Sequence, residues 1–413
     1  MKSLPVALVL VVLAWIHPVS AQVLSLQEAQ QLALSAQPSL DAYSRAADAA
    51  RSAGAAELQL PDPRLKLGLQ NFPVTTADAF MINRDDMTMK TIGVMQDVVH
   101  AEKRVVQSAR MNAEADSALA ERGVAERQIL RDVALTWWDA HAAVERMRLL
   151  RLIANEVRIE RQVLTARLAA GGVETRELLA LDTMIAMLED QQQMALRDER
   201  KARALLGRWI GVAAERPFVE SNPSLEESAK ATIARLRSES RLDAHPLAAT
   251  ARAMEAVSLK EVERARLERK PDWSWEVMLG LRASSRADML SFQVSIPLLW
   301  DTANRQDRRV AEKLALAERA HLLLQDRERQ LAAEIQTGLV EWDSIIARER
   351  LFRSQLLPTS QNRLETALAS YAAGKGPYSL VAEARRAVID ARMQLASIQA
   401  ELRKAAVNLR FYE

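Results

Sequence analysis

The sequence predicts a mainly helical fold with a small β part, and three observations support this prediction. Strong helix formers, above all Ala, Leu, Arg, Glu and Gln, dominate the 413 residues, which include only 12 Gly and 13 Pro. Two stretches, residues 102–170 and 302–373, are long enough for unusually extended helices and contain one Pro between them. Three short segments instead alternate apolar and polar side chains, the period-two pattern that is typical of strands, and a fourth, residues 87–98, is assigned as a strand by its place in the internal repeat.

Charge and cysteine content exclude several classes of function. The 56 Lys and Arg are balanced by 54 Asp and Glu, so a net charge of +2 leaves no basic excess for nucleic acid. The chain has no Cys, which excludes disulfides, metal sites with Cys ligands, a thiol nucleophile and a lipid attached to Cys. We therefore expect no nucleic-acid partner and no lipid anchor.

Residues 1–21 have the pattern of a cleavable signal peptide. Lys2 precedes the apolar stretch 4–16, and the segment from Val19 to Ala21 has the small-x-small pattern of a cleavage site. A retained membrane anchor is the alternative, but about 13 apolar residues fall short of the ~20 that span a bilayer. We therefore expect export, with Gln22 as the first residue of the mature chain.

The landmarks of the chain occur twice in one order, which indicates an internal repeat. We predict one repeat at residues 22–220 and another at 221–413, each with a helix, a strand pair, a long helix, a tight turn and a helix. The first helix is expected over residues 24–60, and Pro358 should break or kink the second long helix. The strand pairs are expected at about 64–98 and 273–298, and the turns near residues 171 and 374. The landmarks that match between the two repeats are Pro38 with Pro246, Pro61 with Pro271, Trp138 with Trp342 and Gly171 with Gly374.

Each strand candidate has an apolar face, and two interpretations of these faces are open. The strands form surface hairpins packed on a helical core, or their apolar faces contact lipid, with tryptophans at the membrane interface. The large size of the apolar faces favours contact with lipid. Four strands cannot close a barrel, and lipid does not accept an open sheet edge. If the strands contact lipid, several chains must therefore share one barrel. On the opposite face, Lys66 and Glu276 should tolerate change. The residues expected at lipid or its interface are Leu65, Leu67, Leu69, Trp273, Trp275, Val277, Leu279, Phe292 and Trp300.

The duplicated landmarks resemble the TolC family of outer-membrane efflux proteins over essentially the whole mature chain. The motifs that carry the resemblance are the opening at residues 24–38, the Pro-Asp before each strand pair, the Leu168–Gly171 turn with residues 178–180, and the Tyr371–Gly374 turn with the heptad seam that follows it. The resemblance implies a TolC-like homotrimer with one shared 12-stranded outer-membrane β-barrel, four strands per chain, continued by a long periplasmic α-helical barrel. The protein would lie in the outer membrane of a Gram-negative bacterium, in contact with its lipid.

The resemblance also implies a function. The chain would be the passive exit duct of a tripartite, RND-type efflux system, with a periplasmic adaptor (membrane fusion) protein and an inner-membrane pump as partners. Residues 61–73 and 87–96 are most similar to the heavy-metal branch of the family, which implies metal cations as substrates. A multidrug or type I secretion duct of the same fold, and an exported coiled-coil interaction protein without a channel, are the alternatives.

The two glycine turns and one carboxylate are the site residues that the resemblance implies. Gly171, Gly172, Gly374, Lys375 and Gly376 would form the periplasmic tip where the adaptor docks. Glycine suits such turns because it adopts positive φ without strain. Just beyond the second turn, Glu383 would contribute to a ring of carboxylates at the aperture, while Leu380 stands where some relatives have a second acidic residue.

The sequence contains no pattern that is typical of an enzyme or a cofactor site. Its five His are scattered, none at metal-ligand spacing, and no phosphate-binding loop is present. The methionines at positions 81, 87, 89 and 95 could offer thioethers to a soft metal such as Cu(I), but Met is also an ordinary apolar filler, the interpretation we prefer. We expect no catalytic residue, no bound cofactor and no metal site.

Overall fold

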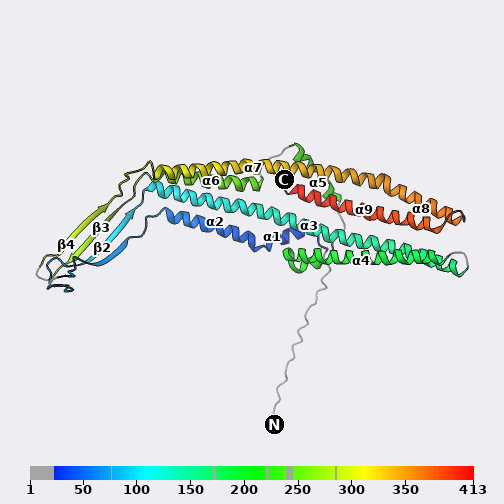
Figure 1. The fold of residues 1–413 in the computed structure, drawn as a ribbon, viewed down its shortest axis with the longest axis horizontal. Helices are drawn as coiled ribbons and strands as arrows, with labels where there is room; N and C mark the ends of the chain where they lie inside the picture. The colour runs from blue at the N-terminus through cyan, green and yellow to red at the C-terminus, as the bar shows by residue number, and fades with distance from the viewer. Residues whose placement is uncertain (1–22, 76, 171–173, 220–222, 239–244, 284–285) are drawn as a thin grey trace, which may run out of the picture. The chain divides into compact units, whose positions relative to one another are not determined.

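The computed structural model describes residues 23–75, 77–170, 174–219, 223–238, 245–283 and 286–413. These residues form long helices and one four-stranded sheet (Figure 1). The expected signal peptide at 1–21 and the expected turn residues Gly171 and Gly172 lie outside this part of the chain. None of the helices in the described ranges combines the length and the apolar character that crossing a membrane requires.

The order of helices and strands in the first half recurs in the second. Two shorter helices precede a strand pair, and long helices follow it. The first half contains α1 (Leu26–Ser35), α2 (Pro38–Glu57), β1 (Arg64–Gln70), β2 (Met89–Val98), α3 (Ala101–Ala169) and α4 (Thr175–Ile210). The second half contains α5 (Pro223–Ser238), α6 (Pro246–Leu267), β3 (Trp273–Leu281), β4 (Met289–Ser295), α7 (Gln306–Leu351), α8 (Leu357–Ala372) and α9 (Tyr378–Arg410).

The expectation of one helix over residues 24–60 is wrong, because the chain breaks between α1 and α2. Gln37 is extended, with φ −94° and ψ 107°, and Pro38 begins the next helix. A residue before proline avoids the helical region, whereas proline itself is well accommodated in the first helical turn. The break recurs at His245, which is extended before Pro246 and whose side chain accepts a hydrogen bond from the backbone N–H of Leu247.

The second long helix does not stop at Pro358. A single π-helical turn, Phe352–Leu356, connects α7 to α8, and the residues on both sides of it keep helical dihedral angles. Proline lacks an N–H and its ring crowds the preceding turn of an α-helix. A wider π turn just before the proline accommodates both defects, so the chain is not broken there. The expected kink stays a prediction, and a π turn is one of the usual places for one.

The described chain forms two compact units, and each combines segments from both halves of the sequence. The helical unit contains the described residues up to 36 together with 130–230 and 344–407. The sheet unit contains 37–129, 231–343 and 408–413. Neither compact unit is therefore built from one half of the chain alone.

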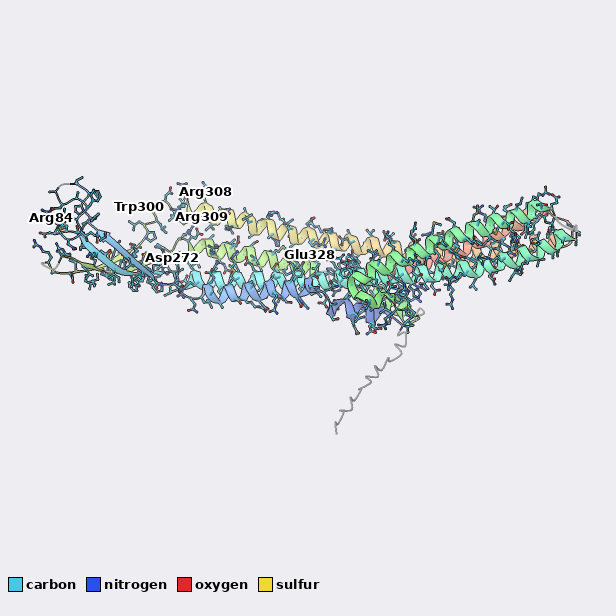
Figure 2. The ribbon with its side chains drawn as sticks, turned by 90° about the horizontal axis from the view of Figure 1, so that it is seen from below. Arg84, Asp272, Trp300, Arg308, Arg309 and Glu328 are labelled. Atoms are coloured by element: carbon cyan, nitrogen blue, oxygen red, sulfur yellow. The ribbon has the colours of Figure 1, made fainter. Side chains whose placement is uncertain are left out.

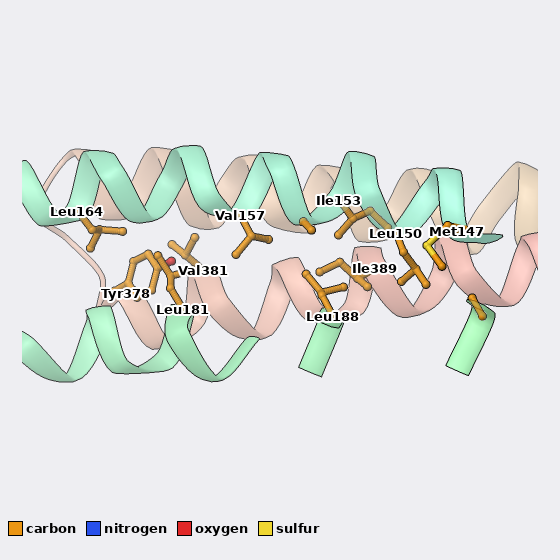
Figure 3. Close-up of a cluster of buried hydrophobic side chains, with 12 residues drawn as sticks. Met147, Leu150, Ile153, Val157, Leu164, Leu181, Leu188, Tyr378, Val381 and Ile389 are labelled. Carbon is orange, nitrogen blue, oxygen red and sulfur yellow. The ribbon is translucent and has the colours of Figure 1, made fainter. Parts of the chain in front are cut away.

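Heptad seams hold the helical unit together (Figure 3). On α3, Leu150, Val157 and Leu164 are spaced by seven residues and are buried. On α4, Leu181 and Leu188 continue the same spacing. A seven-residue apolar repeat keeps one stripe of a helix facing its partner, as in a coiled coil. These helices pack in this way with α9, which contributes Val381, Ile389 and the buried ring of Tyr378.

The sheet unit contains a single antiparallel sheet in the order β1-β2-β3-β4. The register places Leu67 opposite Ile92, Ile92 opposite Leu279, and Leu279 opposite Leu290. Within the described chain, β1 and β4 each pair on one side only. The sheet therefore has two open edges, which sheets normally cover or pair.

Candidate functional site

The register brings the apolar residues of all four strands onto one face of the sheet. Leu67 and Phe292 on this face are 71% and 69% exposed, so it does not pack against helices of its own chain. The interpretation of these strands as hairpins packed on a helical core is therefore wrong. The apolar face comprises Leu65, Leu67, Leu69, Ile92, Val94, Val98, Trp273, Trp275, Val277, Leu279, Leu281, Leu290, Phe292 and Val294, with Lys90 and Gln96 as its polar members.

The central strands expose their apolar face more than their polar face, and we infer from this that the sheet curves toward its polar face. In the central strands, Gly93, Glu276 and Gly280 of the polar face are buried, whereas Ile92 and Leu279 of the apolar face are exposed. The difference indicates that the polar face is concave, as the inner wall of a closed barrel is.

An ion pair crosses this concave face. Lys66 on β1 reaches over β2 to Glu276 on β3. Gly93 lies opposite Lys66 in the register and leaves the path clear, and a Cβ there would come within 2.8 Å of the Val277 carbonyl oxygen. The Glu276 side chain is only 12% exposed and the Lys66 side chain is 47% exposed, so a change at Glu276 should disturb more packing than one at Lys66; tolerance at both positions stays a prediction.

The tryptophans lie at the end of the sheet from which the helices begin. Trp273 pairs with Val98, the last residue of β2, shortly before α3 begins. Trp275 pairs with Gln96 and Val294. Trp300 follows β4 and is 87% exposed (Figure 2). The structure thus brings Trp273 and Trp275 together on the apolar face, and it places Trp300 in the segment between β4 and α7.

The turn after α8 has the geometry of a Schellman cap. Gly374 has φ +68°, its N–H donates to the Tyr371 carbonyl oxygen, and the N–H of Lys375 donates to the Ser370 carbonyl oxygen. Both bonds satisfy carbonyl groups that the end of a helix leaves free. Gly376 does not share the positive φ; a Cβ there would instead lie 2.8 Å from the Ser370 hydroxyl oxygen.

Gly374→Val should strain this turn by about 1–2 kcal/mol, because a β-branched residue is disfavoured at positive φ. If the turn docks an adaptor, export should fall while the amount of protein in the outer membrane stays the same. The measurement is resistance to the exported substrate beside quantitative immunoblots of membrane fractions. Gly123→Ala in α3 is the control, since the nearest atom to a Cβ there is the Pro246 Cβ at 3.7 Å, an ordinary contact. Unchanged resistance in the Gly374 variant would remove this turn from the docking surface.

A buried polar cluster close to the turn joins α3 to α9. The Tyr378 hydroxyl donates to Glu160 Oε1 at 3.1 Å, and Arg385 Nε lies 2.7 Å from Glu160 Oε2. The side chains of Arg385 and Glu160 are only 15% and 14% exposed. We call these three residues the Glu160 cluster; a buried carboxylate of this kind needs both a charge partner and a hydrogen bond.

A second link joins α8 to α4 on the other side of the turn. The Tyr371 hydroxyl donates to Glu177 Oε2 at 2.9 Å, and the rings of Tyr371 and Tyr378 meet edge to face at 5.4 Å between centroids. The two tyrosines therefore fasten the α8/α9 hairpin to α3 and α4. Sequence reasoning missed both links; the only available signal was a pair of tyrosines flanking the glycine turn.

The protonation of Tyr378 should make the helical unit sensitive to alkali. Burial raises the pKa of the Tyr378 hydroxyl, and the nearby Glu160 carboxylate raises it further. The folded state then holds this proton more tightly than the unfolded state. The stability that the protonated hydroxyl contributes is therefore fully present below about pH 10 and is lost as the pH rises above that value. Helix unfolding followed by circular dichroism should show a steeper loss of stability above about pH 10 in wild type than in Tyr378→Phe. Equal slopes would contradict this assignment.

Glu383 lies on α9 with its side chain 61% exposed, and its Oε1 is 2.6 Å from Arg363 Nη2 on α8. Leu380, one turn earlier, is also exposed. The Glu383 carboxylate is thus accessible to solvent but paired within its own chain, a contact that the sequence did not reveal. Elsewhere, no group of three or more His, Cys, Asp or Glu in the described ranges is arranged to hold a metal ion.

A family model matches the second half of the chain. Residues 234–412 match the family described as "Outer membrane efflux protein". This stretch covers α6, β3, β4 and the helices from α7 to α9. Efflux proteins move substrates rather than convert them, which agrees with the prediction that the chain is not an enzyme. No curated protein matches the sequence.

Solved structures share the fold over almost the whole chain. CusC aligns with a TM-score of 0.77 and 14% identity, covering 94% of this chain and 91% of that one. VceC from Vibrio cholerae aligns with a TM-score of 0.74 and 15% identity, covering 94% and 95%. A membrane protein from Pseudomonas aeruginosa aligns with a TM-score of 0.78 and 17% identity, covering 94% and 89%. The predicted fold class, mainly helical with four strands per chain and TolC-like, is confirmed.

Proposed function

We propose that this chain, whose residues 234–412 match the family described as "Outer membrane efflux protein", is the outer-membrane exit channel of a tripartite efflux system. The observation that carries the proposal is the sheet, whose apolar face is exposed and whose polar face is concave. Lipid is the environment that accepts such an apolar face, and the concave polar face suits a water-filled pore. An exported coiled-coil protein without a channel would have no use for this arrangement.

The open sheet edges support a homotrimer. One chain supplies four strands, too few to enclose a pore, and unpaired N–H and C=O groups at β1 and β4 are costly in lipid. Pairing β4 of one copy with β1 of the next removes every edge. Three copies would form the 12-stranded barrel that the resemblance to the TolC family implies, in the outer membrane after export by the signal peptide and without a lipid anchor.

Single cysteines test the orientation of the sheet, because the natural chain contains none. Ser291 and Phe292 are adjacent on β4 and lie on opposite faces. In planar bilayers, a charged water-soluble thiol reagent should reduce the conductance of Ser291→Cys and leave Phe292→Cys unchanged. If the reagent blocks only Phe292→Cys, the apolar face and not the polar face lines the pore. If the unmodified protein forms no pore, the proposed channel is overturned.

The two helical turns are the proposed docking sites for the periplasmic adaptor, and the inner-membrane pump supplies the energy. Of the five tip residues, Gly374, Lys375 and Gly376 lie in the described turn. We further propose metal cations as substrates, since residues 61–73 and 87–96 resemble the heavy-metal branch. Deletion of the gene should then sensitise cells to metal salts more than to drugs; the reverse result would favour a multidrug duct.

Glu383 is the proposed gate carboxylate. Three copies around an aperture would attract cations and repel one another. Glu383→Gln should lower the preference of the channel for cations, while Glu365→Gln serves as a control on α8, on the other side of the same turn. The reversal potential in a salt gradient measures the preference. An identical reversal potential in wild type and Glu383→Gln would remove this residue from the gate.

A further inference from the structure

All the methionines in the described strands lie on the polar, concave face of the sheet. The register places Met89 and Met95 of β2, Met278 of β3 and Met289 of β4 on this face, and none on the apolar face. The apolar face is built from Leu, Ile, Val, Trp and Phe. If methionine served only as apolar filler in these strands, it would be equally suited to the lipid side.

Two of these methionines converge on one glycine. Gly280 of β3 pairs directly with Met289 of β4, and the Sδ of Met89 lies 2.9 Å from the position that a Cβ on Gly280 would take. The Met89 thioether therefore lies over bare backbone, close to the strand that carries Met289. Directly paired residues of neighbouring strands have their Cβ atoms about 4.5–5.5 Å apart, so the flexible Met289 side chain can bring its sulfur beside that of Met89.

A third methionine is adjacent. Met278 precedes Gly280 by two residues and lies on the same face of β3. Met95 lies lower on β2, beside Glu276 in the register, and is not part of this group. We call Met89, Met278 and Met289 the methionine group.

We propose that the methionine group is a contact site for soft monovalent metal ions, of the Cu(I) and Ag(I) class, on the wall of the channel. Thioethers are soft ligands that prefer such ions. The chain has 14 Met and no Cys, so its soft ligands are thioethers, which do not form disulfides outside the cytoplasm. The proposal rests on the proposed function, because only there does the concave face line the path of the substrate.

The test uses the purified full-length channel in detergent and silver nitrate as the probe. Bound silver is measured by elemental analysis after equilibrium dialysis. The double variant Met89→Leu, Met289→Leu removes two sulfurs and keeps the side-chain volume. It should weaken silver binding at least tenfold, since even indirect changes around a metal site cost about 10–100-fold. Met95→Leu, on the same face outside the group, and Met254→Leu on α6 are the controls and should bind as wild type does.

A measurement in planar bilayers tests the methionine group and the proposed channel function separately. Silver ions should block or slow the potassium current of wild type, and the double variant should lose this effect while its potassium conductance stays unchanged. A normal potassium conductance with equal silver binding in wild type and both kinds of variant would overturn the methionine site and leave the channel intact. Absence of potassium conductance in wild type would instead overturn the proposed function.

Discussion

Phe292→Arg should destabilise the membrane-inserted protein by about 2–4 kcal/mol, whereas Gln293→Arg should change its stability little. Phe292 lies on the apolar face, opposite Val277 near the middle of β4, and is largely exposed in the single chain. If that face contacts the hydrocarbon core, the substitution places a charge where no water can solvate it. Gln293, the next residue, lies on the concave face, where water surrounds the new charge.

Refolding into lipid vesicles measures the difference. The free energy of unfolding in urea should fall for Phe292→Arg, and less of the variant should reach the outer membrane of cells. The two substitutions differ by one position on the same strand, so the place in the strand and the change in net charge are matched. Equal tolerance of Arg on both faces would show that neither one contacts lipid.

Glu160→Ala should have the second large effect, a loss of about 3–5 kcal/mol in the stability of the helical unit. The substitution leaves the Arg385 guanidinium buried without its carboxylate and removes the acceptor of the Tyr378 hydroxyl. Breaking a buried pair on one side costs more than the pair itself contributes, because the remaining charge stays desolvated. The α8/α9 hairpin should then separate more readily from α3, and the purified channel should conduct more than wild type in planar bilayers.

Hydrogen exchange of α9 amides and single-channel conductance give the two readouts. Glu189→Ala is the matched control: Glu189 lies 3.3 Å from Arg158, but both side chains are about half exposed. Removal of such an exposed pair should cost no more than about 1 kcal/mol. Similar exchange rates in the two variants would mean that the Glu160 cluster does not hold the hairpin.

Local patterns in the sequence predicted the strands and the longest helix well. The alternation at residues 64–70 matches β1, and the Pro-free stretch at 102–170 matches α3 to within one residue at each end. Both predictions depend on periodicity and on the absence of helix breakers, which are properties of neighbouring residues. The open edges also followed from the sequence, because counting four strands needs no knowledge of packing.

Contacts between distant residues could not be predicted in this way. Glu160 and Tyr378 are 218 positions apart, and nothing around Glu160 distinguishes it from other glutamates on a long polar helix. The same applies to the ion pair between Lys66 and Glu276, which depends on the register of three strands. The division into α1 and α2 is different: Pro38 marked it locally, but the helix-forming residues on both sides outweighed that signal in the prediction.

The mixed composition of the two compact units has a consequence for biogenesis. The helical unit needs residues 344–407 and the sheet unit needs 231–343, so neither can form while only the first half of the chain is available to fold. Contacts of such long sequence separation form slowly, since a large loop must close before they contribute. If the chain is exported as proposed, it must therefore stay unfolded in the periplasm until its second half arrives, with its apolar strand residues accessible. We expect its assembly to depend on periplasmic chaperones, and depletion of them should lower the amount of the proposed trimer before it affects synthesis.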